Sequence, residues 1–409
     1  MSLTARLKCV HVLVSCVLLA VPSLLMAQAG SLDPTFGSSG IATTPAASFG
    51  AAALQSDGKI VVVGSVSSAQ GPAVLRYDTN GGLDPTFGTG GQVTFNFNDS
   101  GSAFAVAIQG DGKILFAAPD ELQLAILRLN TNGSLDTSFG SKGVAFIPDT
   151  APFLVPANGT IALADGKILL VAHSLELGNN AFERLLSNGT PDSTFGTNGA
   201  ALLVASGQML ALQPSGQILV LNSMFNQGAV SGYNANGSLN GTFGGAGQAA
   251  GYGTGAGMAV IDSTSEFIVA GSLVTTPLSP QGNTGFLLVR YTSNGNIDTT
   301  FGTNGVTTTS FPGNLFSAAA AVALQSNGDV VAGGSTAATS DNSSDLDFAL
   351  ARYTASGTLD TTFGTNGLVT TAIGTKGSAI NTLLIQKDGK ILAFGNSSEG
   401  ITIARYLSE

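Results

Sequence analysis

Few residues of this chain could carry chemistry, and most of them are acids. Asp341, Asp345 and Asp347 lie in or beside one long loop, and Asp120 and Glu121 are adjacent in another segment. Two carboxylates can act together as acid and base, or they can hold a calcium ion. A solvated acidic loop among Ser and Asn residues explains the same pattern more simply, and we favour it.

Histidine and cysteine give little support for a catalytic or metal-binding site. Beyond residue 29, His173 is the only histidine, which excludes histidine-rich metal sites and histidine relays. Its apolar surroundings favour a structural role over that of a general base. Cys9 and Cys16 are the only cysteines, so the chain beyond them has neither disulfides nor thiol chemistry.

We predict no cofactor and no metal, with calcium as an open alternative. Residues 78–84 read DTNGGLD, which has the oxygen-rich character of a calcium loop. The segment lacks the fuller ligand series and the closing Glu of such loops. An Asn-Gly hairpin turn accounts for the same residues, and we prefer it.

The first 29 residues have the pattern of a secretory signal. Arg6 and Lys8 precede an apolar run, and Ala27-Gln28-Ala29 fits the small-x-small cleavage pattern. A membrane anchor that is not cleaved is the alternative. No later stretch approaches roughly 20 uninterrupted apolar residues, so we expect no membrane insertion of the mature chain. We expect a bacterial protein that is secreted or periplasmic.

Charge argues against nucleic acid as a partner. Removing residues 1–29 lowers the basic count from 15 to 13 and leaves 25 acids, so the net charge becomes −12. A negative chain is repelled by phosphate backbones and by anionic lipid.

One phrase, Leu-Asp-x-x-Phe-Gly, recurs with variations and fixes the architecture. Its Phe residues are 48 to 62 positions apart: Phe36, Phe87, Phe139, Phe195, Phe243, Phe301 and Phe363. A period of this length is typical of propellers and solenoids. We expect each Phe to pack between neighbouring repeats, because burying such a ring contributes roughly 1.5–3 kcal/mol.

Each repeat reads as four short strands. In the unit 317–371 we expect strands at 317–325, 329–333, 348–353 and 359–364, the last continuing into 368–371. Asn-Gly and Asp-Gly pairs between the first two strands are hairpin signals. Four antiparallel strands per unit predict a propeller blade, and a β-solenoid is the alternative.

The chain is therefore expected to be all-β, a seven-bladed β-propeller with four antiparallel strands per blade. Residues 30–409 form one domain, whose predicted blades are 50–96, 103–147, 158–204, 208–250, 257–309, 317–371, and 378–407 together with 32–44. The N-terminal strand joins the last blade and closes the ring, which removes a free edge.

An Arg is followed eight residues later by an Asp in five repeats, and ring closure supplies a sixth pair. The pairs are Arg76 with Asp84, Arg128 with Asp136, Arg184 with Asp192, Arg290 with Asp298, Arg352 with Asp360, and Arg405 with Asp33. The fourth repeat has Gly232 and Asn240 instead, so both partners are lost together. We predict structural cross-strand pairs, with a ring of ligand-binding arginines as the alternative.

These phrases, with Asp-Gly-Lys-Ile and Arg-Tyr between them, resemble the delta-60 repeat family of exported bacterial propellers. The resemblance covers the chain after residue 29. It implies the fold and export, and it carries no general activity.

Two faces of the ring differ in loop character. The loops between the second and third strands and the loops between blades lie on one face, and they vary in length. Binding residues of rigid scaffolds are usually found in such variable loops. We expect this face to present Asp341, Asp345, Asp347, Asp120, Glu121 and His173. We expect a monomeric, non-catalytic scaffold that binds a protein or polymer. A carboxylate-based hydrolase or lyase at the channel mouth and a purely structural surface protein are the alternatives.

Overall fold

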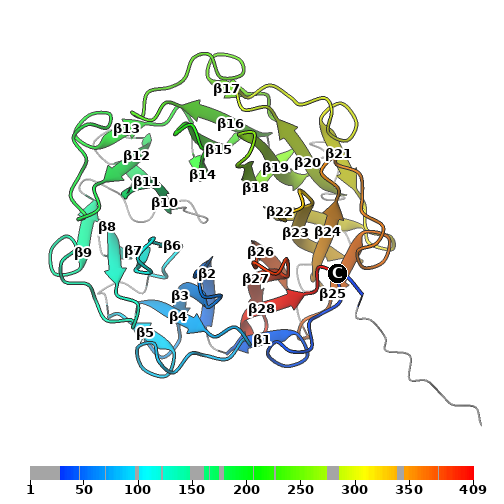
Figure 1. Cartoon of the computed structure of the whole chain (residues 1–409), viewed down its shortest axis with the longest axis horizontal. Coiled ribbons are helices and arrows are strands. Elements are labelled where there is room, and N and C mark those ends of the chain that lie inside the picture. Colours follow the sequence, from blue (N-terminus) through cyan, green and yellow to red (C-terminus); the bar gives the residue numbers. More distant parts are fainter. Residues whose placement is uncertain are drawn as a thin grey trace, which may run out of the picture.

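The computed structural model is a ring of seven four-stranded antiparallel sheets around a central channel (Figure 1). It describes residues 28–409 except 46, 70, 97–100, 121–122, 148–160, 165, 175–178, 206, 225–226, 274–284, 339–344 and 376. Its elements are all strands, so the predicted seven-bladed propeller is confirmed. Over the described residues, no helix has the length and apolar character needed to cross a membrane. The predicted signal, apart from its last two residues, lies outside this range.

In the first six blades the strands run outward from the channel in chain order. The first blade holds β2 (Ala47–Leu54), β3 (Ile60–Val66), β4 (Pro72–Tyr77) and β5 (Gln92–Thr94). The second holds β6 (Ala105–Ile108), β7 (Ile114–Asp120), β8 (Gln123–Leu129) and β9 (Val144–Ile147). The third holds β10 (Ile161–Ala164), β11 (Lys167–Ser174), β12 (Asn179–Leu185) and β13 (Ala200–Leu202). The fourth holds β14 (Gly207–Leu212), β15 (Ile218–Met224), β16 (Gln227–Tyr233) and β17 (Gln248–Ala249).

The remaining blades follow the same plan. The fifth holds β18 (Thr254–Ile261), β19 (Glu266–Ser272), β20 (Phe286–Tyr291) and β21 (Val306–Thr309). The sixth holds β22 (Phe316–Leu324), β23 (Val330–Ala337), β24 (Asp347–Tyr353) and β25 (Leu368–Thr371). The seventh holds β26 (Ala379–Ile385), β27 (Ile391–Ser397), β28 (Gly400–Tyr406) and, from the other end of the chain, β1 (Ile41–Thr44).

The Leu-Asp-x-x-Phe-Gly phrase is a turn, so its expected strand is corrected. In the sixth blade only Leu368–Thr371 is a strand, and the phrase before it makes a single bridge from Leu359 to Tyr353. The Asp360 carboxylate accepts hydrogen bonds from the backbone and hydroxyl of Thr362, which bends the chain. Gly364 follows at φ 53°, a conformation that favours glycine.

Chain closure occurs in the seventh blade as expected. Strand β1 pairs with β28, with Ile41 opposite Ala404 and Thr44 opposite Ile401. The Asp33 N–H donates to the Arg405 carbonyl at 2.8 Å, and the Leu407 N–H donates to the Ser31 carbonyl at 2.9 Å. The two chain ends therefore build together the turn that every other blade makes from one continuous segment.

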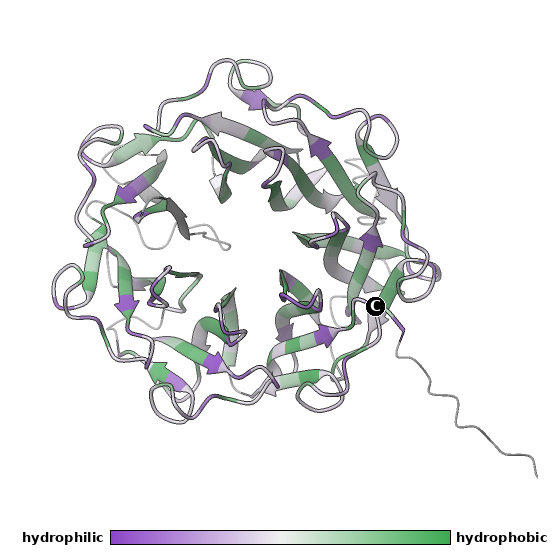
Figure 2. Ribbon diagram, in the orientation of Figure 1, coloured by the Kyte–Doolittle hydropathy of each residue, from purple (hydrophilic) through white to green (hydrophobic). Residues whose placement is uncertain are grey.

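The core consists of the contacts between blades. All seven Phe residues of the repeated phrase are fully buried. Phe139 of the second blade, for example, packs in one cluster with Ile168 and Leu185 of the third. Hydrophobic residues concentrate in the strands, whereas the most hydrophilic residues stand at the ends of strands around the ring (Figure 2). Stacking of the blades thus supplies the burial that an isolated four-stranded sheet lacks.

The ring has two faces that we name by their connections. The tight-turn face carries the turns after the first and third strands of each blade, such as residues 55–59 and 78–82. The variable-loop face carries the loops between second and third strands and the connections between blades.

Candidate binding surfaces

Each predicted Arg and Asp pair is part of a joint between blades. In the first blade the Arg76 Nε donates to the Asp84 carboxylate at 2.9 Å. One terminal nitrogen of Arg76 donates to the backbone carbonyl of Thr131 in the second blade. The guanidinium also lies 4.6 Å from the centre of the Phe87 ring, a favourable cation–π distance. The arginine therefore ties two strands and two blades together.

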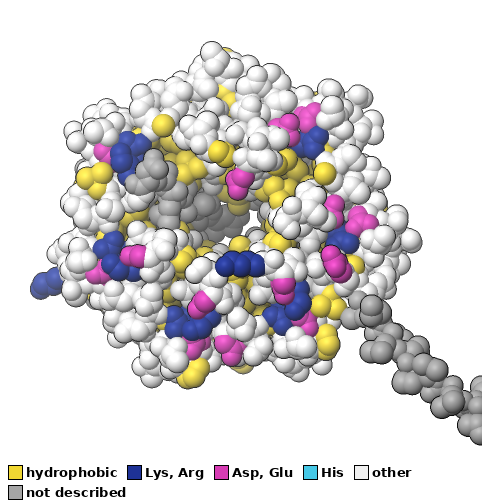
Figure 3. Space-filling model, viewed as in Figure 1, with side chains coloured by type: hydrophobic (Ala, Val, Ile, Leu, Met, Phe, Trp, Pro, Cys, Tyr) yellow, Lys and Arg dark blue, Asp and Glu magenta, His cyan; other side chains and the backbone are white. Residues whose placement is uncertain are grey.

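The structure brings all six predicted pairs together in this way. The Arg Nε to Asp Oδ2 distances are 2.6–2.9 Å for Arg76–Asp84, Arg128–Asp136, Arg184–Asp192, Arg290–Asp298, Arg352–Asp360 and Arg405–Asp33. Each guanidinium lies over the Phe of its own blade's phrase. Clusters of basic and acidic side chains accordingly surround the tight-turn face, with none over the fourth blade at the top (Figure 3). Their packing accounts for these arginines without a ligand.

A lysine joins four of the pairs, and sequence reasoning missed it. The ammonium groups lie 2.8–3.2 Å from the paired carboxylate: Lys59–Asp84, Lys113–Asp136, Lys167–Asp192 and Lys390–Asp33. The recurrent Asp-Gly-Lys sequence could have predicted that this lysine has a shared structural role. The lysine follows the first turn, which the hairpin places beside the third strand.

These contacts favour ionised carboxylates. Burial alone would raise the pKa of Asp33, but hydrogen bonds from Thr35 and Lys390 and the charge of Arg405 lower it to about 2. The contribution of this carboxylate to stability is therefore present above its unfolded pKa near 4 and is lost as the pH falls towards 2. The hydrogen bonds from Lys167 and Thr194 likewise lower the pKa of Asp192, against the effect of burial.

The fourth blade replaces the ionic joint with other contacts. Gly232 and Asn240 stand where the other blades have Arg and Asp. Gln213 instead donates to the Ser293 carbonyl at 3.0 Å, the counterpart of the carbonyl that receives arginine elsewhere. The Phe243 ring stacks on Phe267 at a centroid distance of 6.0 Å. Loss of both charges together leaves no unpaired buried charge.

The candidate acids are spread over the variable-loop face. Asp345 and Asp347 lie together beside the start of β24, where burial and then the neighbouring charge of Asp345 raise the pKa of Asp347. Asp120 ends β7 in the second blade, across the ring (Figure 1). Asp341 and Glu121 lie outside the described residues. The backbone of His173 pairs with Asn180 within the third blade, and its side chain is outside the description.

No group of three or more His, Cys, Asp or Glu side chains that could hold a metal occurs in the described part of the chain. At residues 78–84, the Asp78 carboxylate accepts hydrogen bonds from the backbone of Asn80 and Gly82 at 2.8 and 3.0 Å. This carboxylate therefore shapes the hairpin turn that we preferred over a calcium loop.

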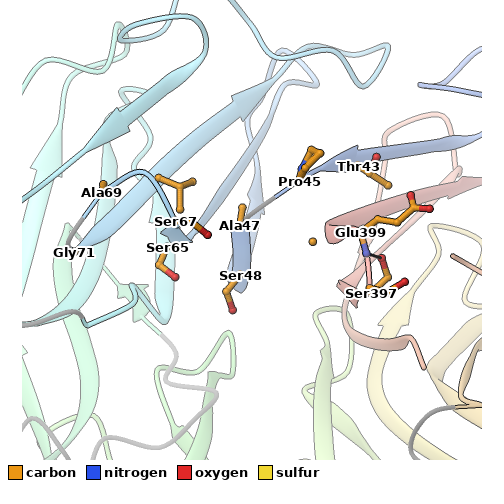
Figure 4. Close-up of a pocket in the computed structure, with 13 residues that line it drawn as sticks. Thr43, Pro45, Ala47, Ser48, Ser65, Ser67, Ala69, Gly71, Ser397 and Glu399 are labelled. Atoms are coloured by element: carbon orange, nitrogen blue, oxygen red, sulfur yellow. Dashed lines mark hydrogen bonds between the residues drawn. The ribbon is translucent and has the colours of Figure 1, made fainter. Parts of the chain in front are cut away.

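A cavity of about 760 Å³ opens on the variable-loop face where the seventh and first blades meet. Figure 4 shows Ser48 and Ser65 on the first-blade side, with Ser397 and Glu399 on the seventh-blade side. Thr43 belongs to the closing strand β1, so three segments distant in sequence meet here. No local motif could reveal a pocket that exists only because the ring closes.

Hydroxyl groups dominate the lining of this closure pocket. They come from Thr43, Ser48, Ser65, Ser67, Ser397 and Ser398, and Glu399 supplies the one carboxylate among the described lining residues. The Glu399 N–H donates to the Ser397 hydroxyl at 3.0 Å, and that hydroxyl contacts the Thr402 hydroxyl at 2.9 Å. Hydroxyls both donate and accept hydrogen bonds, so the pocket suits an uncharged polar ligand or a backbone segment.

Five segments of the chain match the model of a family described as "Domain of unknown function (DUF5122) beta-propeller": residues 55–87, 109–139, 163–195, 268–301 and 325–363. A search of curated proteins finds no match.

Solved propellers of different functions share the fold. Virginiamycin B lyase from Staphylococcus aureus has a TM-score of 0.52 at 9% identity, covering 90% of this chain and 99% of that one. YCF48 bound to D1 peptide has a TM-score of 0.53 at 14% identity, covering 96% and 100%. The extracellular domains 1-2 of Drosophila Semaphorin 1b have a TM-score of 0.50 at 8% identity, covering 94% and 88%. These likenesses concern the fold, and together with the family matches they identify the chain as a β-propeller repeat protein.

Proposed function

We propose that this protein is an exported scaffold that binds a protein or polymer through its variable-loop face. The closure pocket carries the proposal, because it is a built cavity of about 760 Å³ lined by hydroxyl groups. Its size is that of ordinary ligand pockets. The structure of YCF48 with a peptide supports only the general point that a propeller of this fold can present a binding surface.

Binding without catalysis suits the lining. Among its described lining residues the closure pocket has one carboxylate, Glu399, whereas glycoside hydrolysis uses two that face each other. A peptide backbone or a sugar offers the alternating donors and acceptors that serine and threonine hydroxyls match. The signal pattern of residues 1–29 supports export, and the mature domain would then meet its partner outside the cytoplasm.

A substitution that fills the closure pocket tests the proposal. Ser398 is exposed on its rim, and Ser398→Trp should block entry, whereas Ser215→Trp places the same ring on the tight-turn face. Immobilised wild-type and variant proteins are exposed to envelope extract and culture medium, with and without calcium. We expect the Ser398→Trp variant to lose a partner that wild type and Ser215→Trp retain.

The chain contains no tryptophan, so each variant also carries its own fluorescence probe. Equal recovery of every captured partner by the three proteins would contradict binding at this pocket.

A further inference from the structure

A second cavity, of about 810 Å³, lies on the tight-turn face beside the channel mouth, where it is lined by residues of the fifth, sixth and seventh blades. Ile261, Leu324 and Ile385 supply an apolar floor, and Asp262 and Glu266 supply two carboxylates. Hydrophobic side chains rim the channel mouth on this face (Figure 3). We call this the seam pocket. It combines an apolar surface with negative charge, which the closure pocket does not.

One substitution in the repeat makes the lining of this pocket more apolar. At the neighbouring seams a glutamine after the first strand bridges to the next blade. Gln213 donates to the Ser265 carbonyl at 2.5 Å, and Gln325 donates to the Gly389 carbonyl at 2.8 Å. Strand pairing places Ile261 at the corresponding position of the fifth blade. An isoleucine side chain cannot make that hydrogen bond, and here it gives the pocket an apolar lining.

A second substitution reverses the local charge. Strand pairing aligns the fifth blade with the first, because Phe267 pairs with Tyr291 in the same way that Ile60 pairs with Tyr77. Glu266, the residue before Phe267, therefore takes the position of Lys59. The other lysines at this position each contact the aspartate of the arginine pair. In the fifth blade a carboxylate takes the place of that ammonium.

The charge of this carboxylate is not balanced nearby. Arg290 also lines the seam pocket, but it is paired with Asp298 at 2.6 Å. Lys387 lies on the opposite wall, where its ammonium donates to the Ser56 carbonyl at 2.7 Å. Neither Asp262 nor Glu266 forms an ion pair with any described residue, so the pocket favours a cation.

We propose that the seam pocket binds a lysine side chain of a partner polypeptide. The aliphatic stem packs against Ile261, Leu324 and Ile385, and the ammonium bonds to Glu266. Lysine stems bury well against apolar surface while the charged head stays with polar groups. The first, second, third and seventh blades already hold their own lysine against a carboxylate, so the partner supplies what the fifth blade lacks.

Two peptides test the chemistry by calorimetric titration of the intact protein. The probes are acetyl-Gly-Ser-Lys-Ser-Gly-amide and the same peptide with norleucine, which keeps most of the stem and loses the ammonium. The lysine peptide should bind at least fivefold more tightly, with affinity falling as salt is raised. Equal affinity for both peptides, or no binding of either at millimolar concentration, would overturn the proposal.

A matched pair of variants tests whether the peptide binds in the seam pocket. Glu266→Lys restores the lysine of the sister blades, which should pair with Asp298 and weaken peptide binding at least tenfold. Asp329→Lys makes the same charge change at the equivalent position of the sixth blade, but Asp329 does not line the seam pocket. It should change binding less than twofold. Thermal melting checks that both variants fold.

Unchanged binding by Glu266→Lys, or equal losses in both variants, would refute the site. Ser398→Trp on the opposite face should leave peptide binding unaltered, so failure here and failure of the closure pocket are distinguishable.

Discussion

Glu183 is a carboxylate at a position where the other blades have an apolar or small residue. The residue before the arginine position is apolar or small in the other blades: Leu75, Leu127, Ser231, Val289, Ala351 and Ala404. Glu183 occupies this position in β12 and is 9% exposed. Burial raises the pKa of its carboxyl from 4.5 to about 7. The folded state therefore favours the protonated form.

The sign of the pH effect follows from that shift. Between pH 4.5 and 7 the folded chain binds this proton more tightly than the unfolded chain, so the stability contributed by Glu183 falls as the pH rises. Glu183→Gln keeps the side chain neutral. It should raise the free energy of unfolding by about 2–3 kcal/mol at pH 8 and by much less at pH 4.5.

Thermal melting at the two pH values measures the difference. Glu399→Gln, at an exposed carboxylate, is the control and should show no such pH dependence. An equal gain from Glu183→Gln at both pH values would contradict the assigned cause.

Contacts between individual residues could be predicted from the sequence where the same spacing recurs in several repeats. Arg76 and Asp84 are eight residues apart across one turn, so the repeated spacing predicted their pairing. Lys59 joins the same carboxylate from another strand, and its role emerged only with the strand register. Ser48 and Glu399 meet through ring closure, which no spacing within a repeat encodes.

At the scale of the blade, the fourth unit shows how one joint is exchanged for another. A Cβ added to Gly232 would lie 2.4 Å from Cγ of Phe243, far inside van der Waals contact. The Phe243 ring thus occupies space that the arginine stem takes in other blades. Gln213 and Phe267 complete the replacement, so the glycine is compatible only with its altered neighbours.

Restoring the common residue should therefore be harmful. Gly232→Arg forces the Phe243 ring to move and should lower the free energy of unfolding by about 1–3 kcal/mol, as overpacking does. Gly241→Arg is the control, because a Cβ there meets nothing within 4 Å. Denaturant unfolding compares the two. A Gly232→Arg variant as stable as wild type would show that the arginine slot is still available.

The strand pattern of a blade was predictable from its turns and apolar runs. The exception is the segment 359–364, expected as strand and found as a turn. Its Leu and Phe resemble strand residues, but the Asp360 carboxylate captures the Thr362 backbone and the glycine takes a positive φ. Local side-chain hydrogen bonding therefore outweighs the apolar pattern.

The whole molecule depends on joining its two ends. Neighbouring blades bury the aromatic core, and the last blade is completed only when β1 pairs with β28. Sequence could indicate this closure because Arg405 finds the partner of its repeat, Asp33, only in the N-terminal part of the chain. The Asp33 and Arg405 contact at 2.9 Å repeats the joint of the other blades across the chain ends.

Disulfide trapping of this pairing tests the closed ring most directly. Thr43 lies opposite Thr402 in the register of β1 and β28, and the chain beyond Cys16 has no cysteine. Paired residues of neighbouring strands have the Cβ separation that a disulfide needs, whereas the next residue along points to the other face. Thr43→Cys with Thr402→Cys should oxidise to an intramolecular disulfide, seen by intact mass before and after reduction, and Thr44→Cys with Thr402→Cys should stay reduced. Failure of the first pair to oxidise, or equal oxidation of both, would contradict the closure of the propeller.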